Sequence, residues 1–257
     1  MTELIEKEPL SRSKRSKAAQ VILITGGTSG IGHSLAEAFL AQGALVAICG
    51  RSETALEQFR KDHPEGLAIR ADVTIAADRA AMLDAVVERF GKLDVLVNNA
   101  GTFVDRDFTS GKDATEDLEP EIALNLTAPI QLTSEVLVRW PTISSLVFVT
   151  SGLALAPPTR APTYGAVKAG LHAFAEALRR QLAPRDVHVL ELLPGLTDTP
   201  MNASHPAKHK MSPEAVADVT LKALAGSKPM ALPGIVKALP MLLRLAPRTT
   251  KRLVAES

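Results

Sequence analysis

The sequence contains very little cysteine, no excess of charge of either sign and no long apolar run. Its single cysteine, Cys49, excludes an intramolecular disulfide, which fits a reducing compartment. The 29 basic residues are balanced by 28 acidic ones, so no overall field attracts nucleic acid or an anionic membrane. No run of about 18 apolar residues occurs, and acidic residues stand near the N-terminus where a secretory signal needs an apolar run. We therefore expect a cytoplasmic protein that binds no nucleic acid.

The composition predicts one globular domain preceded by a polar tail. With 257 residues, 46% of them hydrophobic, the chain is long enough for a single α/β domain with a substantial core. Residues 1–18 are polar and include the basic run 11–17. Such a run either touches nucleic acid or lipid head groups or is solvated, and we favour a disordered basic tail. The folded domain is thus predicted to span 19–257.

A glycine-rich loop follows the first predicted strand. The apolar run 21–25 leads into Gly26-Gly-Thr-Ser-Gly30-Ile-Gly32 and then into an amphipathic helical pattern. A strand, a glycine turn and a helix together point backbone N–H groups and a helix N-terminus at a phosphate. Glycines let the backbone approach a pyrophosphate closely. A purely structural turn is the alternative, but the placement between strand and helix favours a dinucleotide site.

The residue after the second strand bears on which dinucleotide is bound. The strand 45–49 is followed by Gly50-Arg51-Ser52. An acidic residue here bonds the 2′-hydroxyl of NAD, whereas an arginine accommodates the 2′-phosphate of NADP. Because the acid is absent and Arg51 is present, we predict NADP(H) in preference to NAD(H). The alternative is that Arg51 is a solvated side chain beside Ser52, the N-cap of helix 53–61.

Six strands alternate with helices along the chain. This alternation predicts a Rossmann-type doubly wound parallel sheet in three α/β/α layers, with right-handed crossovers. A long helix is expected over 122–140, where Pro129 frees the carbonyl of Asn125. Ligands bind where the carboxyl ends of parallel strands meet. The strands are expected at 21–25, 45–49, 66–71, 94–98, 146–151 and 187–193, with a short last strand at 230–232.

Candidate binding residues stand directly after these strands. They are the glycine loop, Arg51, Asp72, the Asn98–Gly101 turn, Ser151 and Pro194-Gly195. We expect all of them at one rim of the sheet, where they form a single crevice.

Tyr164 and Lys168 are four residues apart in a predicted helix over 163–182, so they share one helical face. An ammonium fixed beside a phenol favours the phenolate, which suits Tyr164 to donate and accept a proton near neutral pH. Such pairs also arise by chance on helices. The convergence of the strand-end residues on one crevice leads us to assign this pair to the interconversion of alcohol and carbonyl.

Several motifs together resemble the single-domain branch of the short-chain dehydrogenase/reductase family over residues 20–230. They are Thr25-Gly26-xxx-Gly30-x-Gly32, Asn98-Asn-Ala-Gly101, Asn125, Ser151 and Tyr164-xxx-Lys168. Segments 152–154, 161–163 and 193–201 further resemble its DltE-like oxidoreductase subgroup. In two positions the chain departs from the family pattern: Thr150 replaces the first serine of a Ser-Ser pair, and Ser29 stands where many NADP-dependent members have a basic residue.

The resemblance implies a catalytic set and a cofactor site. In the catalytic set, Ser151 would polarise the carbonyl, Tyr164 would transfer the proton, Lys168 would hold the nicotinamide ribose, and Asn125 would anchor a water. Thr199 would bind the carboxamide. With the strand-end residues, the predicted cofactor-binding set is Gly26, Thr28, Ser29, Gly30, Ile31, Gly32, Arg51, Asp72, Val73, Asn98, Ala100, Gly101, Tyr164, Lys168, Pro194, Gly195, Thr197 and Thr199.

The C-terminal part is expected to serve substrate and subunit contacts. The segment 198–210 is predicted to be a mobile loop that closes over substrate. It contains His205 and His209, but Pro206 lies between them and no third ligand is near, so we predict no metal. The extension 233–257 combines apolar and basic residues that would suit an anionic membrane surface. Because prolines interrupt it, we favour a cover for the pocket or a subunit contact.

A stripe of small residues on the tyrosine helix would let that helix pack closely against a second subunit. The stripe consists of Gly165, Ala166, Ala169, Gly170 and Ala173. We therefore expect a homodimer or a homotetramer.

The sequence thus predicts an NADP(H)-dependent oxidoreductase that interconverts a carbonyl and a secondary alcohol on a small or medium apolar substrate. The alternative is a dinucleotide-sensing regulatory protein that retains the fold without physiological turnover and acts through the tail or the C-terminal segment. A sugar epimerase or dehydratase of the larger branch would need a longer substrate domain than this chain offers.

Overall fold

The computed structural model describes residues 19–205, 207 and 209–256, so the tail predicted at 1–18 lies outside the described residues. Within this part of the chain, seven strands form one parallel sheet in the order β3-β2-β1-β4-β5-β6-β7. The order reverses between β1 and β4, which is where a crevice opens in sheets of this kind. The predicted doubly wound sheet is confirmed. The strands are β1 (Val21–Thr25), β2 (Leu45–Gly50), β3 (Leu67–Arg70), β4 (Val95–Asn98), β5 (Ser145–Val149), β6 (His188–Leu192) and β7 (Met230–Ala231).

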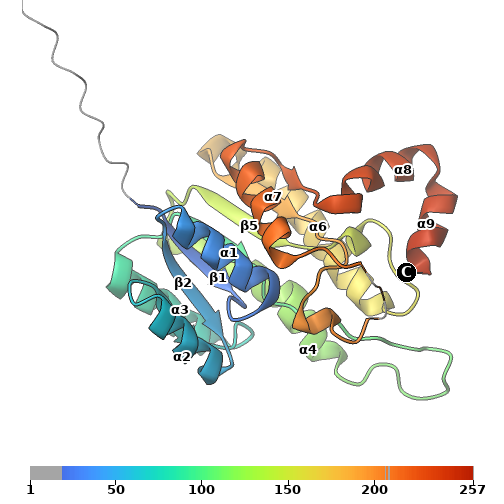
Figure 1. Cartoon of the computed structure of the whole chain (residues 1–257), viewed down its shortest axis with the longest axis horizontal. Coiled ribbons are helices and arrows are strands. Elements are labelled where there is room, and N and C mark those ends of the chain that lie inside the picture. The colour runs from blue at the N-terminus through green and yellow to red at the C-terminus, as the bar shows by residue number, and fades with distance from the viewer. Residues whose placement is uncertain (1–18, 206, 208, 257) are drawn as a thin grey trace, which may run out of the picture.

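Helices cover both faces of the sheet (Figure 1). One face packs against α1 (Gly30–Ala41), α2 (Glu53–Asp62) and α7 (Pro213–Ala225). The other packs against α3 (Ala76–Phe90), α5 (Ala128–Arg139) and α6 (Pro162–Leu182). Alternate residues of each strand feed the two cores, as the period of two along a strand requires. The expected helix start at Ser52 is confirmed, because its side chain accepts a hydrogen bond from the N–H of Ala55. Ser212 caps α7 in the same way by accepting from the N–H of Ala215.

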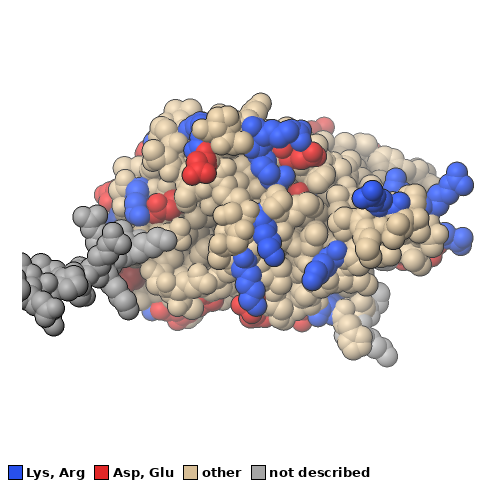
Figure 2. Space-filling model, turned by 90° about the horizontal axis from the view of Figure 1, so that it is seen from above, with Lys and Arg blue, Asp and Glu red and all other residues tan. Residues whose placement is uncertain are grey.

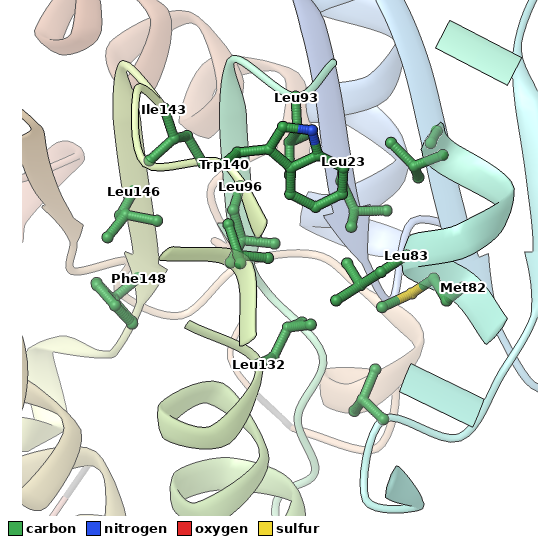
Figure 3. Packing of buried hydrophobic residues seen from close by; sticks show 14 of the residues in the cluster. Leu23, Met82, Leu83, Leu93, Leu96, Leu132, Trp140, Ile143, Leu146 and Phe148 are labelled. Carbon is green, nitrogen blue, oxygen red and sulfur yellow. The ribbon is translucent and has the colours of Figure 1, made fainter. Parts of the chain in front are cut away.

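The core on the α3–α5–α6 face fixes the central strands (Figure 3). Side chains from β1, β4 and β5 meet side chains from α3 and α5 there, and nearly all of them are excluded from solvent. The central strands therefore cannot shift independently, and their carboxyl ends form a rigid rim. The residues labelled in Figure 3 are Leu23, Met82, Leu83, Leu93, Leu96, Leu132, Trp140, Ile143, Leu146 and Phe148.

The region between β4 and β5 differs from the single long helix predicted over 122–140. Here α4 (Leu118–Ile122) and α5 are joined by the π-helical segment η1 (Ala123–Thr127), and the N–H of Ala128 donates to the carbonyl of Ala123, five residues back. Pro129 has no N–H to continue a regular α-helical ladder to Asn125. Such π segments are frequent at functional sites.

The C-terminal extension forms η5 (Gly234–Ala238), α8 (Leu239–Leu245) and α9 (Pro247–Ala255), which stand to one side of the sheet (Figure 1). The prolines of α8 and α9 lie in their first turns, where a missing N–H costs nothing. The N–H of Thr159 donates to the carbonyl of Ala255 at 3.1 Å, which ties α9 to the loop before α6.

The surface carries charges of both signs. On the face that Figure 2 shows, Lys and Arg are intermixed with Asp and Glu over much of the body, while Lys and Arg predominate at the end formed by α8 and α9. Among the residues for which coordinates are described, we find no helix with the length and apolar character that a bilayer crossing demands.

Candidate active site

A cavity of about 1230 Å³ opens at the carboxyl ends of the central strands. It is larger than the ~300–1,000 Å³ of typical small-molecule sites, so it has room for a dinucleotide together with a substrate. All four predicted catalytic residues line it, as do all but two of the predicted cofactor residues. Those that line it are Gly26, Thr28, Ser29, Gly30, Ile31, Arg51, Asp72, Val73, Ala100, Gly101, Asn125, Ser151, Tyr164, Lys168, Pro194, Gly195, Thr197 and Thr199.

The glycine loop is locked to the end of β4. The side-chain N–H₂ of Asn99 donates to the carbonyls of Thr25 (2.8 Å) and Gly26 (3.1 Å). In return, the Thr25 hydroxyl accepts from the N–H groups of Asn99 (2.9 Å) and Ala100 (3.0 Å). Gly26 and Gly30 have φ values of 65° and 54°, which favour glycine. A Cβ at Gly32 would lie 2.3 Å from the Gly26 carbonyl oxygen. This narrow backbone cradle at the start of α1 fits a pyrophosphate.

Arg51 and Asp72 form the far rim of the cavity. The Arg51 side chain is 78% exposed, and its guanidinium lies 3.9 Å from the Asp72 carboxylate. Burial acts to raise the pKa of Asp72, but hydrogen bonds from Thr74 and the charge of Arg51 outweigh it and hold the pKa below its usual value. An exposed pair of this length contributes little to stability. The guanidinium of Arg51 is therefore free to meet an anionic group of a ligand.

Ser151 and Tyr164 come from different parts of the chain and meet in the cavity. Ser151 follows β5, and alternation turns its neighbour Thr150 the other way, onto the buried Glu191 at 2.6 Å. Tyr164 lies in the first turn of α6 and is 8% exposed. Both side chains line the cavity, and the Ser151 side chain acts to lower the pKa of the Tyr164 phenol. Two hydroxyls are thus presented to one point, where a carbonyl or alcohol oxygen of a substrate can bind.

The protonation of Tyr164 differs from the expectation that Lys168 would favour its phenolate. Burial raises the pKa of Tyr164 to about 12, the Ser151 side chain acts to lower it, and the Glu121 carboxylate raises it further. The Lys168 ammonium donates to the carbonyl of Val149 at 3.0 Å and lies 5.7 Å from the centre of the phenol ring. Burial also lowers the pKa of Lys168, to about 8. The expected lowering of the Tyr164 pKa is wrong, because burial is the largest influence on this pKa and raises it.

Asn125 is fully buried in the π-helical segment η1. Its side-chain N–H₂ donates to the carbonyls of Thr102 (3.0 Å) and Glu121 (3.1 Å), and its side-chain oxygen accepts from the N–H of Thr102 (3.2 Å). A Cβ at Gly101 would lie 2.7 Å from that oxygen and 3.4 Å from the Lys168 nitrogen. Glycine at this position therefore allows Asn125 and Lys168 to approach each other.

Comparison with known proteins agrees with this geometry. Residues 20–210 match the family model described as short chain dehydrogenase. The chain belongs to the short-chain dehydrogenase family. It is 39% identical over 184 residues to the uncharacterized oxidoreductase DltE of Bacillus subtilis (strain 168), covering 70% of this chain and 73% of that protein.

Solved structures of short-chain dehydrogenases share the fold of this chain. One is from Sphingobium yanoikuyae in complex with NADPH, with a TM-score of 0.76, 26% identity, and coverage of 90% of this chain and 94% of that one. Another is the 3-ketoacyl-(acyl-carrier-protein) reductase from Brucella melitensis complexed with NADH, with a TM-score of 0.73, 26% identity, and coverage of 82% and 94%.

Two predicted cofactor residues of this short-chain dehydrogenase, Gly32 and Asn98, do not line the cavity. Gly32 serves the close packing of α1 against the glycine loop. The Asn98 side chain donates to the Thr133 hydroxyl at 3.2 Å, and so ties β4 to α5. Adjacent strand residues point to opposite faces, and Asn99 is the one that faces the loop. Both asparagines stand in the same motif, which does not reveal which of them faces the cavity.

The substrate side of this short-chain dehydrogenase contains residues that the sequence did not indicate. The Phe103 ring lies 4.7 Å from that of Tyr164, and the Arg160 guanidinium lies 4.6 Å from the centre of the Phe103 ring. Phe103 and Arg160 line the cavity, as does Leu153. Phe103 and Arg160 belong to loops far apart in sequence, and no motif marks them, whereas Leu153 lies in the 152–154 segment already singled out.

The predicted substrate loop at 198–210 contributes Met201, Asn202 and His205 to the cavity wall. A backbone bridge between Thr197 and Met211 closes its base. No described residue of the extension 233–257 lines the cavity, and its expected role as a pocket cover or a subunit contact stays a prediction. In the described ranges, no three His, Cys, Asp or Glu side chains are grouped so that they could hold a metal ion.

Proposed function

We propose that this oxidoreductase interconverts a carbonyl and a secondary alcohol with NADP(H). The observation that carries the proposal is the meeting of Ser151, Tyr164, Lys168 and Asn125 in one cavity, beside a backbone cradle for a pyrophosphate. A bound nicotinamide dinucleotide would supply or accept the hydride. The residues of the chain orient the substrate and move the proton.

The two hydroxyls act on the substrate oxygen. The Ser151 hydroxyl donates a hydrogen bond to it, and the Tyr164 hydroxyl gives it a proton in reduction or takes one in oxidation. Because burial raises the pKa of Tyr164 to about 12, the phenol carries its proton at neutral pH. A proton donor is what reduction of a carbonyl requires, and in the oxidation of an alcohol the same group takes the proton back.

Lys168 and Asn125 support this chemistry from the wall of the cavity. The Lys168 ammonium is positioned to bind the ribose hydroxyls. Asn125 holds the backbone of Thr102 and the end of α4 in place through its hydrogen bonds to the carbonyls of Thr102 and Glu121. The chain then contributes to catalysis by holding the substrate and the cofactor in position and by transferring a proton at Tyr164.

The apolar wall supports a small or medium apolar carbonyl compound as substrate. Phe103, Leu153, Leu196 and Met201 line the cavity, with Arg160 on the same side. The Arg160 guanidinium is paired with the Asp105 carboxylate at 3.0 Å, so a neutral substrate is favoured over an anionic one.

Arg51 supports NADP(H) as the preferred cofactor. Its guanidinium is exposed at the rim that follows β2. We expect Arg51→Ala to weaken NADPH binding about ten-fold or more and to leave NADH binding nearly unchanged, because only NADPH carries the 2′-phosphate. Fluorescence titration with both cofactors measures this. Equal loss for both cofactors would show that Arg51 does not read the phosphate.

The activity is tested by following the absorbance of NADPH across a panel of ketones and aldehydes. We expect turnover that Tyr164→Phe reduces by about 10² or more while NADPH binding is retained. Phenylalanine keeps the ring that packs against Phe103, so it is a matched control for packing. A protein that binds NADPH without reducing any member of the panel contradicts the proposal, and so does a fully active Tyr164→Phe variant.

The outer face of α6 supports a homodimer or homotetramer, and the single free cysteine supports a location in the cytoplasm. Ala166 and Ala173 are exposed there, whereas Gly165 and Gly170 already pack within the chain, against Pro157 and Leu126. Replacing Ala166 by Glu should dissociate an assembly that uses this face. Light scattering of the wild-type and variant proteins measures it.

A further inference from the structure

A buried ion pair reaches the wall of the cavity through Glu121, and neither member has a role in the chemistry proposed above. Arg106 comes from the loop after β4, and Glu121 comes from α4. Their side chains are 4% and 0% exposed, and their nearest charged atoms are 3.1 Å apart. Thr163, the residue before Tyr164, completes the group.

One oxygen of Glu121 receives all the hydrogen bonds of this carboxylate. Oε2 accepts from Nε (3.2 Å) and Nη2 (3.1 Å) of Arg106 and from the Thr163 hydroxyl (2.7 Å). Arg106 also donates to the carbonyls of Ala114 (2.9 Å) and Glu116 (2.5 Å). The pair therefore joins α4, the 102–117 loop and the first turn of α6, where Tyr164 lies.

The other oxygen of Glu121 has no partner. Within the described part of the chain, Oε1 of Glu121 is the one buried side-chain nitrogen or oxygen without a hydrogen bond. Leaving such an atom unpaired costs about 1–3 kcal/mol. A buried ion pair is also often no more stabilising than apolar residues of the same volume. Stability alone therefore gives little reason for a carboxylate at position 121. The charge of Glu121 does act on Tyr164, since it raises the pKa of the phenol.

We propose that Arg106 and Glu121 are a positioning pair for Tyr164. Through Thr163 the pair fixes the turn that carries the phenol. The Glu121 carboxylate disfavours the phenolate, and the positive charge of Arg106 opposes this effect. Glu121 does not touch the reacting atoms. The inference rests on the proposed role of Tyr164 as the proton donor.

Each element around Tyr164 presents identifiable charges to it. Lys168 comes from α6 itself, Glu121 from α4, Arg106 from the 102–117 loop, and Arg160 from the loop before α6, on the far side of Phe103. Glu121→Gln removes a negative charge and should lower the pKa of Tyr164. Arg106→Gln removes the charge that screens Glu121 and should raise it.

The chain makes this measurable, because Tyr164 is its only tyrosine. Phenolate absorbance after a rapid pH jump, read before alkaline unfolding, titrates Tyr164 alone, and Tyr164→Phe gives the blank. We expect the midpoint to move down by about one pH unit in Glu121→Gln and up in Arg106→Gln. The double variant, which keeps two hydrogen-bonding side chains without charge, should return near the wild type.

The exposed Glu116 supplies the matched control. Glu116→Gln makes the same chemical change five residues away in the same stretch of chain, and it should leave the midpoint unchanged. A merely structural pair would lower stability in both single variants without moving their midpoints in opposite directions. Shifts of the same sign, or a Glu121→Gln midpoint equal to that of Glu116→Gln, overturn the proposal.

Two features keep the test decisive. If Glu121→Gln does not fold at neutral pH, Arg106→Gln can be compared with the double variant. These two proteins differ only in the charge at position 121, so the comparison still measures the effect of Glu121 on the Tyr164 midpoint. The titration needs no turnover, so an inactive protein refutes the proposed function without touching this result. If activity is found, the acid limb of the pH profile for alcohol oxidation should follow the Tyr164 midpoint. It should move to lower pH in Glu121→Gln and to higher pH in Arg106→Gln.

Discussion

Replacing Lys168 by methionine should make the protein more stable while abolishing its proposed activity. Burial lowers the pKa of Lys168 from 10.5 to about 8, so keeping its charge at pH 7 costs the fold about 3 kcal/mol at ~1.36 kcal/mol per pH unit. Methionine has a similar length and no charge. The variant loses the hydrogen bond to the Val149 carbonyl, which offsets about 1 kcal/mol. We therefore expect a net gain of about 2 kcal/mol, or about 4–8 °C in the unfolding midpoint.

The gain should depend on pH in a defined direction. Below pH 8 Lys168 is charged in both the folded and the unfolded state, and the full cost is present. Between about 8 and 10.5 the folded state has released the proton while the unfolded state still binds one, so the stability of the wild type rises with pH. The advantage of Lys168→Met should shrink across this window and turn into a disadvantage of about 1 kcal/mol above it, where the charge cost is gone and the lost hydrogen bond remains. The titration of Tyr164 is common to both proteins and cancels in the difference.

Urea unfolding of both proteins at several pH values from 7 to 10 measures this difference. Lys222 is exposed on α7, so Lys222→Met controls for the loss of a lysine. If Lys168→Met is less stable than the wild type at pH 7, or its advantage is the same at pH 7 and 10, the reasoning is refuted and Lys168 carries no desolvation cost.

Three further predictions follow from buried groups elsewhere. Gly32→Ala should destabilise the fold by about 1–3 kcal/mol and weaken NADPH binding, because its Cβ would lie 2.3 Å from the Gly26 carbonyl oxygen; urea unfolding and fluorescence titration check this. His172→Ala should cost about 1–3 kcal/mol in unfolding experiments, because the buried Glu191 carboxylate loses one of its two partners and keeps only Thr150, whereas NADPH affinity should be retained. Cys49 should resist thiol reagents at pH 8 until the protein unfolds, because burial raises the pKa of its thiol to about 12; a colorimetric thiol assay with and without urea measures this.

The sheet and its ligand-binding rim could be predicted from the sequence because both depend on short-range patterns. Apolar β-branched runs mark the strands, and the helix expected over 163–182 agrees with α6 to within one residue. The carboxyl ends of parallel strands meet wherever the fold is doubly wound, so residues directly after strands can be assigned to one rim. The spacing of four residues between Tyr164 and Lys168 predicted that they share one helical face, and both line the cavity.

The remaining features depend on contacts between segments far apart in the sequence. The Arg106–Glu121–Thr163 group joins three elements, and nothing in the local sequence links its members. The orientation of Asn98 away from the cavity depends on Thr133 of α5. The direction of the pKa shift of Tyr164 depends on burial, which spacing along a helix does not reveal. The π-helical turn at Asn125 likewise follows from how α4 and α5 pack, which a proline alone does not specify.

The bond between Thr159 and Ala255 has a practical consequence for work with this protein. Arg160, the next residue after Thr159, lines the cavity, so α9 is attached almost directly to the substrate wall. A purification tag or fusion partner placed after α9 would act on that wall and could distort kinetic results. The cavity opens at the carboxyl ends of the strands, whereas the start of β1 lies at their amino ends. A tag attached before β1 is therefore farther from the cavity and is the safer choice.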